Sequence, residues 1–163
     1  MLTTLILTRD EERHIARAIR SVAGLGGRVV VIDSGSTDRT VEIARALGAE
    51  VLANPWRNYA TQFNWGLDQL PEGTGWVLRL DADEVLSPEL VAQIAATLPT
   101  LGSEVEGVTM GRRMAFMGRV IRHGGLFPIR VLRIFRHGKG RCENRWMDEH
   151  IKVAGQVVDL PGE

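Results

Sequence analysis

The sequence predicts a single α/β domain with a mixed, mostly parallel sheet and flanking helices. Over the first 100 of its 163 residues, short apolar runs alternate with segments of helical periodicity, as parallel βαβ units require. The run RVVVID at 28–33 is nearly continuous and β-branched, which is typical of a strand buried on both faces. After Pro99 the pattern changes to strands without helices between them, so we expect a mixed sheet.

The first half of the chain should contain four strands, each followed by a helix. The expected strands are residues 2–8, 28–33, 50–53 and 76–80. Apolar residues at helical spacing mark the helices: Ile15, Ile19 and Val22; Val41, Ala44 and Leu47; Phe63, Leu67 and Leu70; Leu90, Ile94 and Leu98. Ser87 and Pro88 form a good start for the fourth helix, with Ser as N-cap and Pro at the first helical position.

Beyond residue 100 we expect strands at 105–110 and 129–136, and one further strand at 151–160. The sequence stops just after that strand without a capping element, which suggests that a C-terminal part is missing. We therefore expect a nucleotide-sugar-binding half at 1–100 and an incomplete acceptor-side half at 101–163.

Charge is distributed unevenly along the chain. The formal net charge is zero, which argues against a nucleic-acid partner. Ten of the 20 Lys and Arg residues lie between Arg112 and Arg145, where Glu143 is the only acid. The first 111 residues carry fifteen acids against nine bases. An acidic N-terminal part and a basic C-terminal part suggest two tasks, such as holding a metal and holding an anion.

Cys142 is the only cysteine, so no internal disulfide can form, and this favours the cytoplasm. No apolar run is long enough for a signal peptide or a membrane-spanning helix. We expect a cytoplasmic protein that at most rests on the anionic inner face of a bacterial plasma membrane.

Acidic residues follow three of the predicted strands. Asp10 and Glu11 follow the first strand, Asp33 ends the second, and Asp81 and Asp83 follow the fourth. Open parallel sheets bind ligands beyond the carboxyl ends of their strands, where these acids would meet. Each cluster is weak evidence by itself, but together they indicate a ligand site.

The segment DAD at 81–83 is the sharpest of these signals. Two carboxylates one residue apart in an extended turn can share a divalent cation and a diphosphate. Their hard oxygen ligands suit Mg²⁺ or Mn²⁺. The alternative is a solvated acidic turn that caps the next helix, but the place of DAD after an apolar strand favours the metal site.

Two acids around the turn SGSTD have competing interpretations. Asp33 could accept hydrogen bonds from a base or a ribose, or it could form the turn, and we favour the nucleotide contact. Asp38 could do the same, but we favour a role in capping the following helix.

A base that deprotonates an acceptor hydroxyl should lie outside the metal cluster. The segment DEH at 148–150 provides Asp148, Glu149 and His150 after the basic stretch. The alternative is a surface cluster of ion pairs.

These segments together resemble the family 2 glycosyltransferases, which have the GT-A fold. TRDEERHIARAIRSV resembles the family's opening strand and helix, with Asp10 where Asn is more usual; VVVIDSGSTDRTVEIA resembles the base-binding segment, and LRLDADE the metal-site segment. The resemblance implies that Thr8, Glu11 and Asp33 contact the nucleoside. It also implies that Asp81 contacts the ribose or diphosphate and that Asp83 binds the metal.

The second half, MGRVIRHGGLFPIRVLRIFRHGKGR followed by DEH, resembles the bacterial subgroup that includes lipopolysaccharide-core β-glucosyltransferases. This resemblance favours Glu149 over Asp148 as the base. We also expect Arg133 and Arg136, on the Arg-rich strand, to bind the nucleotide sugar, and at least one arginine of that strand could reach the diphosphate or an anionic acceptor.

The sequence thus predicts an inverting, metal-dependent hexosyltransferase. It would move a sugar from a nucleoside-diphosphate sugar, with UDP favoured, to a hydroxyl of a bacterial cell-surface glycan or glycolipid. Inversion is implied by the family resemblance. Two alternatives are a sugar-nucleotide nucleotidyltransferase and a non-catalytic module that binds nucleotides or anionic lipids.

Overall fold

The computed structural model describes residues 1–113, 115–116, 119–120, 129–144 and 150–162. Its elements in chain order are β1 (Leu2–Thr8), α1 (Ile15–Ser21), the 3₁₀ turn η1 (Ala23–Leu25), β2 (Arg28–Asp33), α2 (Thr40–Ala46), β3 (Glu50–Ala53), α3 (Tyr59–Asp68), β4 (Trp76–Asp81), α4 (Pro88–Thr97), the 3₁₀ turn η2 (Leu98–Thr100), β5 (Val105–Arg112), β6 (Ala115–Phe116), β7 (Arg119–Val120), β8 (Ile129–Arg136), β9 (Arg141–Cys142), β10 (Ile151–Lys152) and β11 (Gln156–Asp159). The strands predicted at 2–8, 28–33, 50–53 and 129–136 are confirmed with those bounds.

Seven strands form one sheet in the order β11-β5-β8-β4-β1-β2-β3. The strands β3, β2, β1 and β4 are parallel to one another, and β11 is parallel to β5. Between these two groups β8 runs antiparallel to both β4 and β5. The prediction of a mixed, mostly parallel sheet is therefore confirmed.

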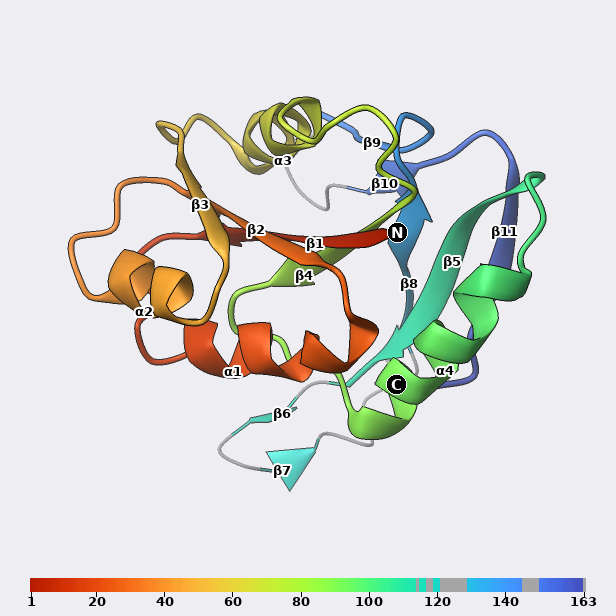
Figure 1. Cartoon of the computed structure of the whole chain (residues 1–163), viewed down its shortest axis with the longest axis horizontal. Coiled ribbons are helices and arrows are strands. Elements are labelled where there is room, and N and C mark those ends of the chain that lie inside the picture. Colours follow the sequence, from red (N-terminus) through yellow and green to blue (C-terminus); the bar gives the residue numbers. More distant parts are fainter. Residues whose placement is uncertain (114, 117–118, 121–128, 145–149, 163) are drawn as a thin grey trace.

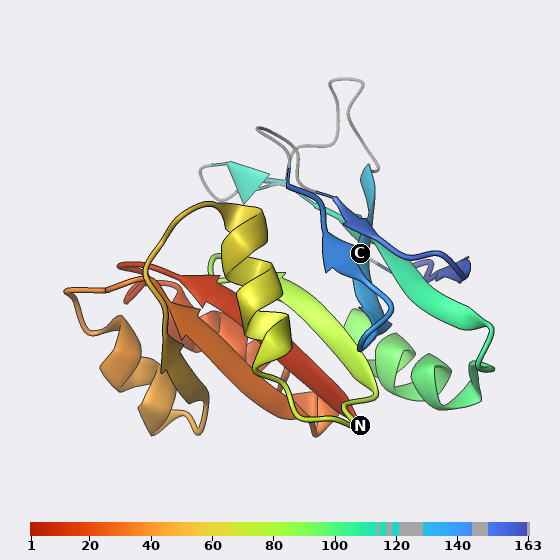
Figure 2. The same ribbon diagram turned by 90° about the horizontal axis from the view of Figure 1, so that it is seen from above.

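The sheet separates two apolar cores, because neighbouring residues of its buried strands point to opposite faces. On β1, Ile6 packs with α1, α2 and α4, whereas Leu5 packs with α3. On β4, Leu78 and Val77 divide in the same way. Figure 1 shows the consequence: α1, α2 and α4 cover the lower face of the sheet and α3 covers the upper face. Figure 2 looks down on α3 where it crosses the sheet.

Local capping signals start two of the helices. The Ser87 hydroxyl accepts a hydrogen bond from the Leu90 N–H at 3.2 Å, and Pro88 is the first residue of α4. This confirms the predicted start of α4. Asn58 caps α3 by accepting from the Thr61 N–H at 2.8 Å. Among the described residues, none of the helices has the length and hydropathy needed to cross a bilayer.

The single strand predicted at 151–160 is wrong, because the chain bends at 154–155 and forms two strands there. Before the bend, β10 pairs antiparallel with β9. After it, β11 joins the edge of the main sheet beside β5. The Gly155 N–H donates to the Glu106 carboxylate at 2.7 Å, which anchors the bend to β5.

Candidate active site

The parallel strands bring the predicted acidic residues to one edge of the sheet. Thr8 and Asp33 are directly opposite each other at the ends of β1 and β2, and Asp81 lies opposite Leu7 at the end of β4. The three segments that the sequence singled out therefore share the carboxyl edge, where α/β sheets bind ligands.

The loops after β1 and β2 are interlocked by hydrogen bonds. Asp10 has a positive φ of 54°, a conformation that Asp and Asn tolerate better than most residues. There its carboxylate accepts from the Thr37 N–H at 2.7 Å, and its own N–H donates to the Ser36 hydroxyl at 2.9 Å. Asp38 accepts from the Glu12 and Thr40 N–H groups, but the N-cap residue of α2 is Arg39, so the cap predicted at Asp38 is wrong by one residue. These bonds fix the two loops as one unit.

Asp33 is buried and forms the turn after β2. Its Oδ2 accepts from the N–H groups of Gly35 and Ser36, both at 3.0 Å, and its Oδ1 accepts from the Ser36 hydroxyl at 2.5 Å. The structure thus gives Asp33 the turn-forming role that the sequence analysis held as the alternative. The contact with a nucleotide stays a prediction.

Thr8 and Glu11, the other two residues predicted to contact the nucleoside, lie at the end of β1 and in the loop after it. The Thr8 hydroxyl is buried and has no hydrogen-bond partner among the described residues, which is unusual for a buried polar group. Glu11 accepts from His14 Nδ1 at 2.6 Å, and its N–H donates to the Thr40 hydroxyl at 2.7 Å. Thr8 therefore has an unused hydroxyl at the site, whereas Glu11 is partly engaged.

The DAD segment forms a tight turn at the end of β4. The Glu84 N–H donates to the Asp81 carbonyl at 3.0 Å, and the Glu84 carboxylate accepts from the Asp81 N–H at 3.2 Å. Ala82 points into the core, whereas the side chain of Asp83 is exposed. The Asp83 carbonyl accepts from the Arg17 guanidinium at 2.9 Å, which ties the turn to α1.

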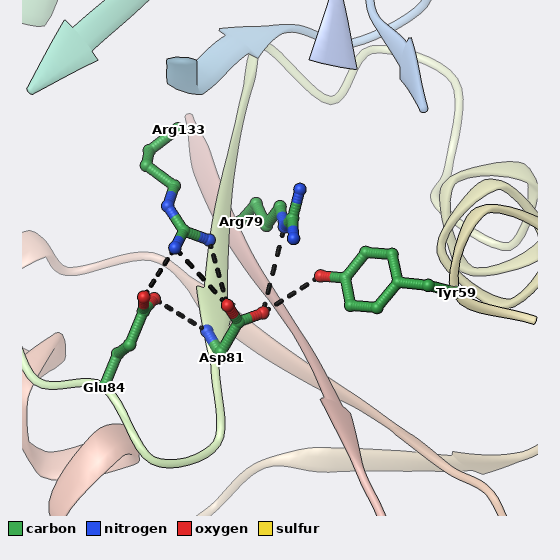
Figure 3. A network of polar contacts seen from close by, with 5 residues as sticks. All are labelled: Tyr59, Arg79, Asp81, Glu84 and Arg133. Atoms are coloured by element: carbon green, nitrogen blue, oxygen red, sulfur yellow. Dashed lines mark hydrogen bonds and ion pairs between the residues drawn. The ribbon is translucent and has the colours of Figure 1, made fainter. Parts of the chain in front are cut away.

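Asp81 and Glu84 are engaged by side chains from distant parts of the chain (Figure 3). Asp81 Oδ1 accepts from the Tyr59 hydroxyl at 2.9 Å and lies 3.8 Å from Arg79 Nε. Asp81 Oδ2 accepts from both Nη groups of Arg133 at 3.3 Å. Arg133 Nη2 also donates to Glu84 Oε1 at 2.5 Å.

Arg133 reaches this turn because of a bulge in β8. Val108 of β5 pairs with Ile134, but the next residue, Thr109, pairs with Leu132, so Arg133 has no opposite residue. A bulge of this kind bends a strand and redirects a side chain. The side chain of Arg133 is only 7% exposed. Arg133 is thus at the site, where its Nη groups are bonded to Asp81 and Glu84, and its contact with a diphosphate stays a prediction.

The surroundings also set the ionisation of these groups. Burial would raise the pKa of Asp81, but the guanidinium groups of Arg133 and Arg79 outweigh it and hold that pKa below its usual value. Burial raises the pKa of Glu84 despite the attraction of Arg133. Burial and the charge of Asp81 raise the pKa of the Tyr59 phenol. Tyr59 therefore acts as a hydrogen-bond donor to an ionised Asp81.

A cavity of about 770 Å³ lies beside the turn, between α1, α4, β5 and β8. Its polar lining combines the three acids of the turn with five arginines: Arg17, Arg79, Arg112, Arg113 and Arg133. The excess of positive charge suits an anionic ligand. Arg112, Arg113 and Arg133 come from the predicted basic segment, and the binding of an anion by that segment stays a prediction.

Arg136 is not at this site, contrary to the prediction that it reaches the diphosphate. Because β8 runs antiparallel to β4, Arg136 pairs with Trp76 at the opposite end of that strand. Its guanidinium stacks over the Trp76 ring at 4.3 Å and donates to the Val105 carbonyl at 2.8 Å. Arg136 is a structural residue that joins β8 to the start of β5.

Three residues at the site were missed by sequence reasoning. Arg79 carried a signal, since a charged residue within the apolar strand WVLRL needs a partner. No pattern in the sequence pointed to Arg17 or Tyr59, because their contacts depend on how α1 and α3 pack on the sheet. The predicted bases Asp148 and Glu149 lie outside the described residues.

The described residues by themselves offer few ligands for a divalent cation. Among the described residues, no group of three or more His, Cys, Asp or Glu side chains could hold a metal ion. Within that same part of the chain, the exposed Asp83 carboxylate has no hydrogen-bond or ion-pair partner. Mg²⁺ commonly binds through one or two carboxylates and the oxygens of a substrate phosphate. Asp83 can supply the carboxylate in such an arrangement.

A mixed, mostly parallel α/β sheet with acidic turns at its carboxyl edge and flanking helices is the architecture of the GT-A fold. The chain belongs to glycosyl transferase family 2, whose sequence profile matches residues 3–149. This membership confirms the resemblance to the family. It also favours glycosyl transfer over the nucleotidyltransferase and the non-catalytic binding module.

This chain spans less than half the length of the relatives described below. An uncharacterized glycosyltransferase of Rickettsia typhi is 45% identical over 93 residues, which are 57% of this chain and 31% of that protein. Glucosyl-3-phosphoglycerate synthase of Mycobacterium tuberculosis, solved with Mn²⁺, UDP and glucosyl-3-phosphoglycerate, aligns with 27% identity and a TM-score of 0.54, over 68% of this chain and 43% of that one. S. aureus TarS, solved with UDP-GlcNAc, aligns with 19% identity and a TM-score of 0.58, over 83% of this chain and 45% of that one.

Proposed function

We propose that this chain transfers a sugar from a nucleoside-diphosphate sugar, with UDP favoured, to a hydroxyl acceptor with the help of Mg²⁺ or Mn²⁺. The observation that carries the proposal is the exposed Asp83 carboxylate at the carboxyl end of β4. A relative in the same fold, the mycobacterial synthase, was solved with UDP and Mn²⁺, which supports this choice of donor and metal. The metal would counter the charge that develops on the leaving diphosphate.

In this proposal the first half of the chain, residues 1–100, binds the donor. Thr8, Glu11 and Asp33 would contact the nucleoside, and the buried Thr8 hydroxyl, which has no hydrogen-bond partner among the described residues, supports this for Thr8. Asp83 would hold the metal. Asp81 is fully engaged by Tyr59, Arg79 and Arg133, so it would contact the ribose or the diphosphate only by exchanging one of these partners.

The second half, residues 101–163, would form the acceptor side. Glu149 or Asp148 would remove the proton of the acceptor hydroxyl, and attack opposite the departing diphosphate would invert the anomeric centre. The resemblance of the second half to lipopolysaccharide-core enzymes supports an acceptor in a bacterial cell-surface glycan or glycolipid. The same acceptor class supports a cytoplasmic enzyme whose basic segment contacts the anionic inner face of the plasma membrane.

The proposal is tested by incubating the protein with a panel of nucleotide sugars and Mn²⁺ and measuring the release of nucleoside diphosphate. We expect release that depends on one donor, that is lost with EDTA and that returns with added Mn²⁺. Release of pyrophosphate from a nucleoside triphosphate and a sugar phosphate would instead identify a nucleotidyltransferase. If no donor is turned over and Mn²⁺ does not bind with UDP, the proposed function is wrong.

A further inference from the structure

Gln62 places a buried amide group between two loops of the candidate active site. It lies in α3, which packs across β1 and β2 (Figure 2), and it is only 1% exposed. Its neighbours in the helix, Ala60, Phe63 and Leu67, belong to the apolar core on this face of the sheet. A buried amide is costly unless its polar atoms are hydrogen-bonded, so the partners of Gln62 indicate what it does.

The amide of Gln62 joins the first residue after β2 to the first residue after β3. Its Nε2 donates to the Ser34 hydroxyl at 3.0 Å and to the Asn54 carbonyl at 2.9 Å, and its Oε1 accepts from Asn54 Nδ2 at 2.7 Å. The orientation of the amide is fixed, because a backbone carbonyl can only accept and must therefore face the nitrogen. Ser34 bonds that same nitrogen, so Gln62 is the donor and the Ser34 oxygen is the acceptor.

This arrangement sets the direction of the Ser34 hydroxyl. Because its oxygen accepts from Gln62, its own proton must point away from that amide. Among the described residues, the Ser34 hydroxyl donates to no acceptor. Ser34 is half-buried, it directly follows Asp33, and its N–H donates to the Thr8 carbonyl at 3.0 Å. Ser34 therefore presents an unused hydrogen-bond donor beside two of the residues proposed to contact the nucleoside.

We propose that Ser34 donates a hydrogen bond to the nucleoside of the sugar donor and that Gln62 is the positioning residue that directs this hydroxyl. This inference rests on the proposed function and adds one contact and its support to it. A hydroxyl whose proton is turned outward requires an acceptor oxygen on the ligand, such as a carbonyl of a pyrimidine base. Because Gln62 is also bonded to Asn54, the same amide links the ends of β2 and β3.

The test is a calorimetric titration with UDP in the presence of Mn²⁺. Ser34→Ala removes the donor and should weaken UDP binding by about three- to tenfold. Gln62→Met keeps the length of the side chain but releases the Ser34 hydroxyl, and it should weaken UDP binding by a similar factor. In turnover both losses should appear in KM for the sugar donor rather than in kcat, because a nucleoside contact is the same in the substrate complex and the transition state.

The double variant separates positioning from a general loss of stability. If Gln62 acts through Ser34, Gln62→Met should cost little further UDP affinity once Ser34→Ala is present, because both changes remove the same contact. Asn58→Ala is the matched control in α3. It removes the N-cap of the helix and should lower the free energy of unfolding, but UDP binding should not change.

Unchanged UDP affinity in Ser34→Ala would overturn the inference, and this variant changes only a half-buried hydroxyl, so it decides the matter even if Gln62→Met does not fold. Losses that add fully in the double variant would also overturn it, because Gln62 would then act independently of Ser34. With UDP binding by the wild type, either result leaves the proposed function intact. If the wild type binds neither UDP nor GDP nor ADP, the proposed function fails instead.

Discussion

The acidic residues at the carboxyl edge of the sheet are held in two different ways. In the loops after β1 and β2, Asp10, Asp33 and Asp38 accept hydrogen bonds mainly from backbone N–H groups. In the turn after β4, Asp81 and Glu84 instead face arginine side chains. The first region uses its acids to shape the backbone, whereas the second uses them to hold buried positive charge.

The kind of partner decides which of these carboxylates is available to a ligand. A carboxylate that fixes a turn has a permanent structural task, and its removal should disturb the fold around it. A carboxylate paired with a buried arginine depends on that arginine, because removal of either partner leaves the other charge buried and uncompensated. Asp83, between Asp81 and Glu84 in sequence, is exposed and faces neither kind of partner within the described residues.

The strongest test of this comparison is Asp83→Asn. We expect turnover to fall by roughly a thousandfold or more, to the level measured with EDTA, because a neutral amide binds a hard dication poorly and the leaving diphosphate loses its counter-charge. The thermal unfolding midpoint should not change, since the Asp83 side chain is exposed. Near wild-type turnover at saturating Mn²⁺ would remove Asp83 from the metal site.

A second test concerns the acids outside the described residues. Glu149→Gln should lower the rate of transfer by about 10²–10⁴-fold, while Mn²⁺ and donor binding stay unchanged, as expected for a base. Asp148→Asn is the matched control and should be nearly as active as the wild type. The measurement is the transfer rate with the true acceptor. A slow Asp148→Asn beside an active Glu149→Gln would exchange the two roles, and two active variants would end the claim that this segment supplies the base.

Asp33→Ala tests the β2 region and should affect both stability and binding. Loss of a buried, charged hydrogen-bond acceptor should cost about 1.5–3 kcal/mol in affinity for the nucleoside diphosphate, measured by calorimetry. It should also lower the free energy of unfolding, because the Gly35 and Ser36 N–H groups lose their acceptor. Metal dependence should remain.

Asp38→Ala is the control for Asp33, because Asp38 also bonds the backbone of these loops. It should destabilise the loops without weakening nucleotide binding. If Asp33→Ala and Asp38→Ala behave alike, with nucleotide affinity unchanged in both, Asp33 is a turn-forming residue and nothing more.

The smallest effect is expected from Tyr59→Phe. This change removes the hydroxyl that donates to Asp81 Oδ1, and the remaining arginines should limit the loss of unfolding free energy to about 1 kcal/mol. The measurement is the free energy of unfolding in a denaturant titration. A loss well above about 1 kcal/mol would show that the arginines do not compensate for the missing hydroxyl.

The sequence by itself determined six of the seven strands of the main sheet, all but β11, together with the start of α4 and the gathering of acids at one edge. These features follow from local rules. Apolar periodicity marks the strands and helices, Ser87 and Pro88 start a helix through their own chemistry, and successive parallel strands must end on the same side. The family resemblance came from the same local segments, and the match over residues 3–149 confirmed it.

Only the tertiary structure decided which side chains face one another at that edge. The sequence placed Arg133 and Arg136 together on one strand, but a bulge turns Arg133 into the acidic turn and the antiparallel pairing carries Arg136 to the opposite end of β4. Tyr59 likewise meets Asp81 because α3 packs above β1 and β2. Side-chain partners depend on strand direction, register and packing between residues far apart in the chain, which local patterns do not encode.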